Sequence, residues 1–133
     1  IWRITMESYL EQPLMHKIWG FGLDTFGLMT MSYRGYTSQI CGQVFDSAHN
    51  EYLQYLVTIG PIGLALYIGF LAAAIRRMLK KSADLKWGAA IALGVGCYLL
   101  QAMVTINLPI ATPIMWMLLS VGAAGCRSRY IQP

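Results

Sequence analysis

Charged residues are scarce in this sequence. Aspartate, glutamate, lysine and arginine make up 12% of its 133 residues, while hydrophobic residues make up 56%. A soluble domain of average composition contains about 25% charged residues. So little charge cannot easily cover the surface of an ordinary soluble domain. We therefore expect lipid to be the solvent for much of the chain.

Cysteine is also rare, with three residues widely spaced along the chain at Cys41, Cys97 and Cys126. Three scattered cysteines form neither a disulfide framework nor a zinc-binding pattern. No cluster of acidic or histidine residues suggests another metal site. We therefore expect no metal and no other cofactor.

Acidic residues are nearly absent from the second half of the chain. Residues 1–58 carry three basic and five acidic side chains, whereas residues 76–86 carry five basic and one acidic. Two more arginines, Arg127 and Arg129, follow in the tail. A net charge of +4 could suit a nucleic-acid-binding protein. Basic residues gathered in one connector and one tail between apolar runs instead indicate membrane topology, and we expect no nucleic-acid partner.

Three uncharged apolar runs lie in the last two-thirds of the sequence. Each is close to the length that crosses a bilayer. The pattern predicts an all-α membrane protein with three transmembrane helices, at about 57–75, 87–106 and 109–125. Because basic loops stay in the cytoplasm, residues 1–56 are expected to be extracytoplasmic and residues 126–133 to form a cytoplasmic tail.

The region before these runs has a different character. Residues 1–12 have the spacing of an amphipathic helix, which Pro13 is expected to end. Residues 13–48 contain many glycines and are expected to be an irregular external loop, in which Phe26–Met31 could form a brief helix or strand. The chain begins without methionine, so we expect it to be the C-terminal fragment of a larger polytopic bundle, with further spans before it.

His49 is the candidate catalytic residue in this external region. Asp46 or Ser47 is expected to cap a helix whose first turn contains His49. The partial positive charge at a helix N-terminus disfavours imidazolium, and a neutral imidazole can act as a general base. The alternative is a histidine that only caps the helix or packs at the membrane interface.

The sequence around His49 carries a family resemblance. His49-Asn50 is followed by nine residues, then Gly60, two residues and Gly63. This spacing resembles the signature of the O-antigen ligase and polymerase superfamily. Upstream, Trp2, Pro13 and Gly20-Phe-Gly resemble the helix and the Pro-to-Gly-x-Gly segment of the large external loop in the same family.

The resemblance implies an enzyme of the bacterial cytoplasmic (inner) membrane that transfers a glycan from a polyprenyl-pyrophosphate donor to an acceptor sugar hydroxyl. His49 would accept the hydroxyl proton, without a metal. The expected partners are the lipid-linked glycan donor, a glycan or lipid-glycan acceptor, membrane lipids and the preceding spans of the same protein.

Arginine suits the donor pyrophosphate because a guanidinium can donate two hydrogen bonds to phosphate oxygens. In the family, an external arginine precedes a Trp-containing helix. If Trp2 matches that helix, the corresponding arginine would precede Ile1. Arg34 and Arg3 are the external candidates for substrate binding in this chain. Each could instead be a solvated surface residue.

Asn50 is a further candidate, either orienting the substrate or His49 or capping the helix. The glycines are expected to be structural: Gly20 and Gly22 in a tight turn rather than a dinucleotide site, and Gly60 and Gly63 where helices approach closely.

Two questions about function remain open from the sequence. A ligase and a repeat-unit polymerase share this pattern and differ in the acceptor. The chain could also be a segment of a membrane transporter whose external loop forms a gate. The apolar runs contain no charged side chain, whereas transporters often carry ionisable groups at that depth.

Overall fold

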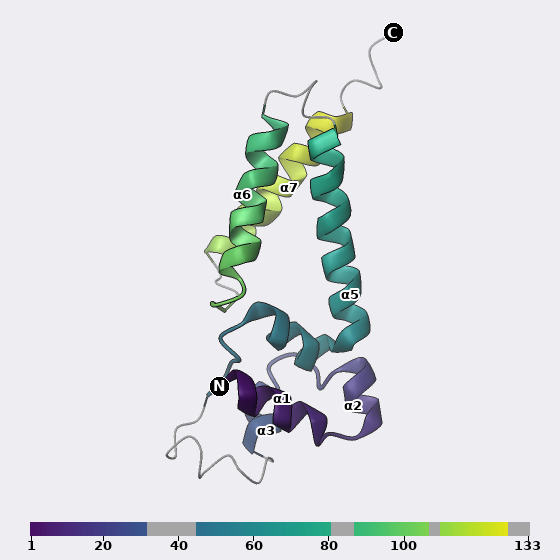
Figure 1. The fold of residues 1–133 in the computed structure, drawn as a ribbon, viewed down its shortest axis with the longest axis vertical. Coiled ribbons are helices and arrows are strands. Elements are labelled where there is room, and N and C mark those ends of the chain that lie inside the picture. The colour runs from purple at the N-terminus through teal and green to yellow at the C-terminus, as the bar shows by residue number, and fades with distance from the viewer. Residues whose placement is uncertain (32–44, 81–86, 107–109, 128–133) are drawn as a thin grey trace. The chain divides into compact units, whose positions relative to one another are not determined.

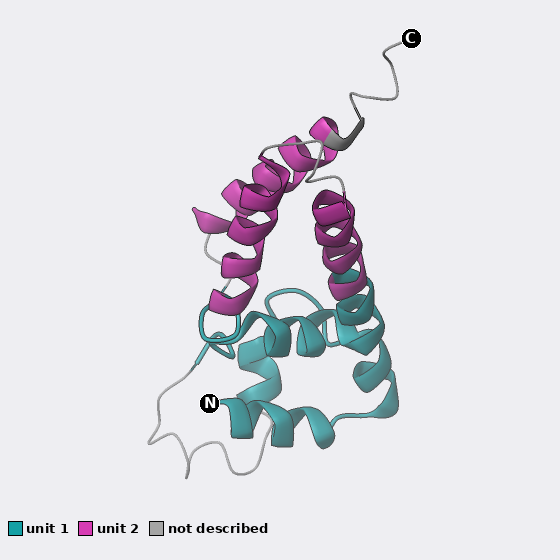
Figure 2. Ribbon diagram, turned by 45° about the horizontal axis from the view of Figure 1, so that its top comes forward, with its two compact units in different colours: residues 1–67, 102–106 teal, residues 68–101, 107–133 magenta. Residues whose placement is uncertain are grey.

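The computed structural model describes residues 1–31, 45–80, 87–106 and 110–127. All regular secondary structure in these ranges is helical, as Figure 1 shows: α1 (Trp2–Leu10), α2 (Leu14–Trp19), α3 (Phe26–Met31), α5 (Glu51–Lys80), α6 (Gly88–Gln101) and α7 (Ala111–Arg127). The all-α prediction is confirmed for this part of the chain. Figure 2 colours two compact units, with residues 1–67 and 102–106 in unit 1 and residues 68–101 and 107–133 in unit 2.

The core of unit 1 lies where α3 and the start of α5 meet the turn before α5. Phe26, Met29, Ala48 and Val57 are buried together. Around them pack the partly buried side chains of Tyr9, Phe21, Phe45 and Leu53. This small core holds together segments from the whole first half of the chain.

Helix α1 turns its larger apolar side chains outward. Trp2, Met6 and Leu10 are exposed, whereas the smaller Thr5 and Ser8 are buried. The amphipathic helix predicted over residues 1–12 is present, with Ile4 buried and Tyr9 packed against the core, but Trp2, Met6 and Leu10 do not face the core of unit 1. The hydroxyl of Thr5 donates to the Ile1 carbonyl, which lets a polar side chain be buried there.

Residues 13–31 are more regular than the sequence pattern suggested. Pro13 does not simply end α1; it occupies the N-cap position of α2, where its missing N–H is not needed. Gly20 ends α2 in a conformation with φ +83°. Phe26–Met31, for which helix and strand were both open, is the helix α3.

Helix α5 is interrupted at Gly60, which has non-helical backbone angles, and Pro61 follows directly. Glu51 and Tyr67 reveal how sharp the interruption is. The Tyr67 hydroxyl donates to Glu51 Oε1 at 3.1 Å, although these residues are 16 positions apart. A straight helix would separate them by about 24 Å along its axis. The kink therefore divides α5 into a short first arm and a long second arm.

Unit 2 contains α6, α7 and the end of α5. Helices α6 and α7 are antiparallel, because Tyr98 contacts Thr112 while Ile91 lies near Gly122. The end of α5 runs parallel to α7: Phe70 stacks near Trp116, and Met78 lies against Gly122. The three helical segments of unit 2 therefore alternate in direction along the chain.

Among the described residues, α5 is the helix that is both long and apolar enough to cross a membrane. Helix α6 has 14 residues and α7 has 17, whereas a crossing takes about 20. The described residues thus do not contain the three full-length spans expected from the sequence. The run expected to be helical to Ile106 stops at Gln101, and the next carbonyl, that of Ala102, accepts a hydrogen bond from the Glu51 N–H.

Candidate functional site

Asn50 starts the helix that follows the candidate histidine. Its side-chain oxygen accepts hydrogen bonds from the backbone N–H groups of Tyr52 and Leu53, at 3.0 and 3.1 Å. These are the N2 and N3 donors that an N-cap residue satisfies. Asp46 and Ser47, the caps expected from the sequence, lie too early, because α5 begins only at Glu51. The capping role that was open for Asn50 is present in the structure.

His49 immediately precedes this cap rather than lying in the first helical turn. Its backbone adopts φ +49°, a left-handed conformation that is uncommon for residues other than glycine. Such a conformation costs about 1–3 kcal/mol and persists only where neighbouring structure imposes it. Here Ala48 is buried on one side and Asn50 caps the helix on the other. The sequence pattern gave no sign of this strain.

The side chain of His49 is exposed, while its backbone is fixed. The indole N–H of Trp2 donates to the His49 carbonyl at 3.3 Å. The ring of Phe45 lies edge-on to the imidazole, with centroids 6.5 Å apart. The imidazole is thus held by its backbone and one aromatic neighbour and is open to a reactant from solvent.

Arg3 follows Trp2 directly in α1, so the structure brings the region of one candidate arginine to the backbone of His49. Arg3 donates to Glu7 at 2.8 Å, and 79% of its side chain is exposed. An exposed ion pair of this kind contributes only about 0.3–0.5 kcal/mol, so an anionic ligand can displace the carboxylate. Arg34, the other candidate arginine, lies outside the described residues.

The kink in α5 frees backbone carbonyls that the Gly20-Phe21-Gly22 segment then satisfies. Pro61 has no N–H to donate to Val57, and the non-helical turn at Gly60 breaks the next bond. The N–H of Phe21 donates to the Val57 carbonyl at 2.8 Å, and that of Gly22 to the Thr58 carbonyl at 3.0 Å. The Gly-x-Gly segment therefore acts as a backbone clamp on the kink.

Two glycines are required where these segments cross. A Cβ on Gly20 would clash with the Thr58 carbonyl oxygen, and one on Gly60 would clash with that of Ile18. Both glycines also have positive φ angles. A close approach is present at Gly60, to the end of α2 at Ile18 and Gly20, whereas a Cβ on Gly63 would meet the side chain of Ile59 in the same helix.

Glu51 is a residue whose burial the sequence did not reveal. It is 1% exposed, next to the Asn50 cap, and accepts a hydrogen bond from the Tyr67 hydroxyl. A carboxylate buried to this degree needs hydrogen-bonding partners. The contact with Tyr67 depends on the kink, and a kink angle cannot be read from the Gly-Pro pair alone. Glu51 helps to fix the start of α5, directly after His49 and Asn50.

The structure brings some of the sequence-predicted residues together at one turn. His49 and Asn50 form one turn, in which His49 is exposed and Asn50 is buried as a cap, and Trp2 connects the start of α1 to that turn. The described ranges contain no group of three or more His, Cys, Asp or Glu side chains that could hold a metal ion. The turn offers one exposed imidazole, which can accept or donate a proton.

Comparisons with family models, with curated protein sequences and with solved structures found no match for this chain.

Proposed function

We propose that this chain belongs to a membrane-embedded transferase that moves a polyprenyl-pyrophosphate-linked glycan to an acceptor sugar hydroxyl, as an O-antigen ligase or a surface-polysaccharide polymerase does. One observation carries the proposal. The two separate segments that resemble this family contact each other: Trp2 donates to His49, and the Gly20-Phe21-Gly22 segment clamps the kink at Gly60. A chance resemblance in two places would not require such contacts.

In the proposed reaction, His49 takes the proton of the acceptor hydroxyl as its oxygen bonds to the anomeric carbon of the donor. The bond between that carbon and the phosphate oxygen breaks, and its electron pair leaves with the polyprenyl pyrophosphate. One direct displacement inverts the anomeric centre. The exposed imidazole fits this role because the acceptor must reach it from solvent.

The leaving pyrophosphate needs its charge stabilised more than it needs a proton. Arg3 and Arg34 are the proposed donors to its phosphate oxygens. Arg3 is exposed beside Trp2, and its surface ion pair with Glu7 is weak enough to be exchanged for a phosphate. Asn50, already engaged as a helix cap, is proposed to act mainly by holding His49 in position.

The proposed location is the bacterial cytoplasmic membrane, with α5, α6 and α7 as three crossings. Their directions alternate within unit 2, as successive crossings must. Arg76, Arg77 and Lys80 lie at the end of α5 that runs alongside the C-terminal end of α7. By the positive-inside rule this end is cytoplasmic, which leaves residues 1–56 outside the cytoplasm. Many side chains of these helices are large, apolar and exposed, as lipid contact requires.

The test is glycan transfer in membrane vesicles that contain the full-length protein, with a radiolabelled lipid-linked donor. His49→Ala and His49→Gln are expected to insert normally, to accumulate donor and to lose about 100-fold or more of the transfer rate. His16→Gln is the matched control, since His16 is the other histidine of the chain and contacts Phe21 rather than the turn at Asn50.

Three outcomes separate the alternatives. Labelled product that depends on His49 supports a transferase. Label that crosses the bilayer without appearing in a new glycosidic bond would support the transporter alternative. Normal transfer by both His49 variants would refute the assignment of His49 as the base.

A further inference from the structure

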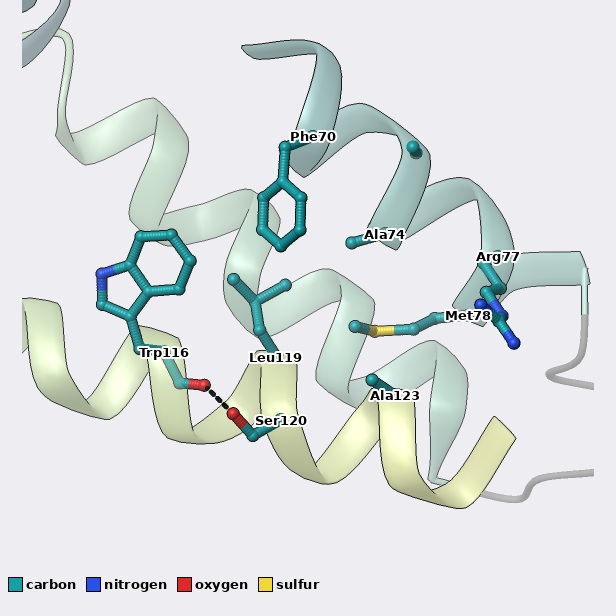
Figure 3. Close-up of a pocket in the computed structure, with 9 residues that line it drawn as sticks. Phe70, Ala74, Arg77, Met78, Trp116, Leu119, Ser120 and Ala123 are labelled. Atoms are coloured by element: carbon teal, nitrogen blue, oxygen red, sulfur yellow. Dashed lines mark hydrogen bonds between the residues drawn. The ribbon is translucent and has the colours of Figure 1, made fainter. Parts of the chain in front are cut away.

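A groove in unit 2 lies between the second arm of α5 and α7. Its volume is about 330 Å³, and most of its wall is apolar. Figure 3 shows Phe70, Ala74 and Met78 on α5 facing Leu119 on α7 across this space, with the ring of Trp116 near that of Phe70. The groove is distant in sequence from His49, and the proposed transfer reaction does not use it.

One end of the groove is aromatic. The rings of Phe70 and Trp116 have centroids 6.0 Å apart and are tilted by 34°. Both side chains remain partly accessible, at 55% and 40% exposure. The hydroxyl of Ser120 donates to the Trp116 carbonyl, so it is turned toward the backbone of its own helix (Figure 3). This end of the groove therefore presents apolar surface to an occupant.

The other end of the groove is basic. Arg77 lines the groove seven residues after Phe70, about 10 Å further along the helix. A second pocket of about 290 Å³ shares Ala73 and Arg77 with the groove and adds Arg76 and Lys80 to its wall. No acidic residue is among the described residues that line either pocket. These residues favour an occupant that is apolar at one end and anionic at the other.

We propose that this groove binds an anionic phospholipid, with its phosphate at Arg77, Arg76 and Lys80 and an acyl chain extending toward Phe70 and Trp116. The inference rests on the membrane location proposed above, not on the transfer reaction. Basic pockets at the cytoplasmic ends of membrane helices bind anionic headgroups. The polyprenyl-pyrophosphate donor is also anionic, but in the proposed reaction its pyrophosphate lies outside the cytoplasm, whereas Arg77 lies at the end of α5 assigned to the cytoplasm. The position of the basic residues therefore favours a phospholipid.

The experiment places a photoreactive benzoylphenylalanine at Ser120 in the full-length protein. The protein is reconstituted in equimolar phosphatidylglycerol and phosphatidylcholine, and the crosslinked lipid is identified by mass spectrometry. We expect phosphatidylglycerol to predominate at this position. The same probe at Leu93, an exposed residue of α6, is expected to capture both lipids in the bulk ratio.

The headgroup contact is tested with Arg77→Gln, which is expected to lower the phosphatidylglycerol preference at Ser120 about fivefold. Arg77→Lys should retain most of the preference, which excludes general damage to the fold. Equal lipid ratios at Ser120 and Leu93 would overturn the proposal. So would a crosslink to protein, or to a polyprenyl lipid when one is added. The transfer assay is separate, so either proposal can fail without the other.

Discussion

The two units differ in what they bury. Within the described ranges, all the polar side chains that are buried belong to unit 1: Thr5, Ser8, Thr30, Asn50, Glu51 and Thr58. The buried large side chains of unit 2 are all apolar: Leu71, Met78, Val95, Met115 and Leu119. Both units also expose large apolar residues. Exposed apolar residues therefore do not distinguish the two units, whereas the residues buried in their interiors do.

The difference between the two interiors indicates where the backbone must be held precisely. Unit 1 satisfies several of its buried polar groups through caps and clamps, such as Asn50 on the start of α5 and Gly22 on the kink, although the hydroxyls of Ser8 and Ser47 are buried without a hydrogen-bond partner among the described residues. The Asn50 cap fixes the backbone directly after His49, and the contact of Gly22 fixes the backbone at the kink. In its described ranges, unit 2 has an apolar interior and exposes many large apolar side chains, an arrangement that suits lipid as the solvent. The proposed chemistry therefore lies in the unit with the directional contacts.

The largest expected effect on stability comes from adding one methyl group at Gly60, where the Gly20-Phe21-Gly22 segment clamps the kink. Gly60→Ala would force a Cβ against the Ile18 carbonyl at a residue with φ +72°, and we expect a loss of about 3 kcal/mol or more of unfolding free energy. Gly69→Ala is the matched control in the same helix, because nothing lies within 4 Å of its added Cβ. Denaturant titration in detergent measures both. Equal stabilities would mean that the clamp at Gly60 does not hold the kink.

A second prediction compares two exposed leucines. Leu93 in α6 is 70% exposed and Leu28 in α3 is 66% exposed. If unit 2 is surrounded by lipid, Leu93→Asp should cost about 3 kcal/mol, while Leu28→Asp in a water-facing unit 1 should cost about 0.5 kcal/mol or less. The amounts of each variant inserted in membranes report this difference. Equal tolerance of both substitutions would contradict the assignment of different solvents.

Removing the Asn50 cap should have an intermediate effect on stability. Asn50→Ala removes the acceptor for two backbone N–H groups and is expected to cost about 1 kcal/mol, whereas Asn50→Asp should retain most of the stability. Transfer should fall with Asn50→Ala and recover with Asn50→Asp if Asn50 acts by positioning His49. A transfer defect in Asn50→Asp at unchanged stability would instead indicate direct contact with substrate.

The smallest effect on stability is expected at Arg3. Its exposed pair with Glu7 contributes about 0.5 kcal/mol or less, so Arg3→Gln should unfold almost like the wild type. If Arg3 contacts the donor pyrophosphate, the KM of the Arg3→Gln enzyme for the donor should nevertheless rise about tenfold or more. Glu7→Gln is the control, because it breaks the same ion pair and keeps the arginine. An unchanged KM in Arg3→Gln would leave Arg34 as the remaining candidate.

The sequence predicted those features that depend on local pattern. The apolar runs indicated helices, and all regular structure in the described ranges is helical, with α5 long and apolar enough to cross a membrane. The helix ends were less accurate, since α5 starts at Glu51 and α6 stops at Gln101. Those ends depend on tertiary hydrogen bonds, such as the one from the Glu51 N–H to the Ala102 carbonyl, which no local pattern encodes.

The candidate site was predictable in its residues but not in its geometry. His49 and Asn50 stood out because they begin a motif that resembles a known family signature, and capping was one of the roles open for Asn50. The positive φ of His49 was visible only in the structure. The clamp between Gly20 and Gly60 joins residues 40 positions apart. The burial of Glu51 depends on the kink angle, which the same clamp helps to set.

The most direct test of the central claim is chemical rescue of transfer in the His49→Ala variant. The claim is that His49 acts as the base, and its exposed position leaves space for a small molecule once the side chain is removed. We expect His49→Ala to lose about 100-fold or more of the transfer rate. Added imidazole should restore part of that rate, and the rescue should increase as rising pH removes the proton from free imidazole. Transfer by His49→Ala within about twofold of wild type, in protein that inserts normally, would contradict the claim.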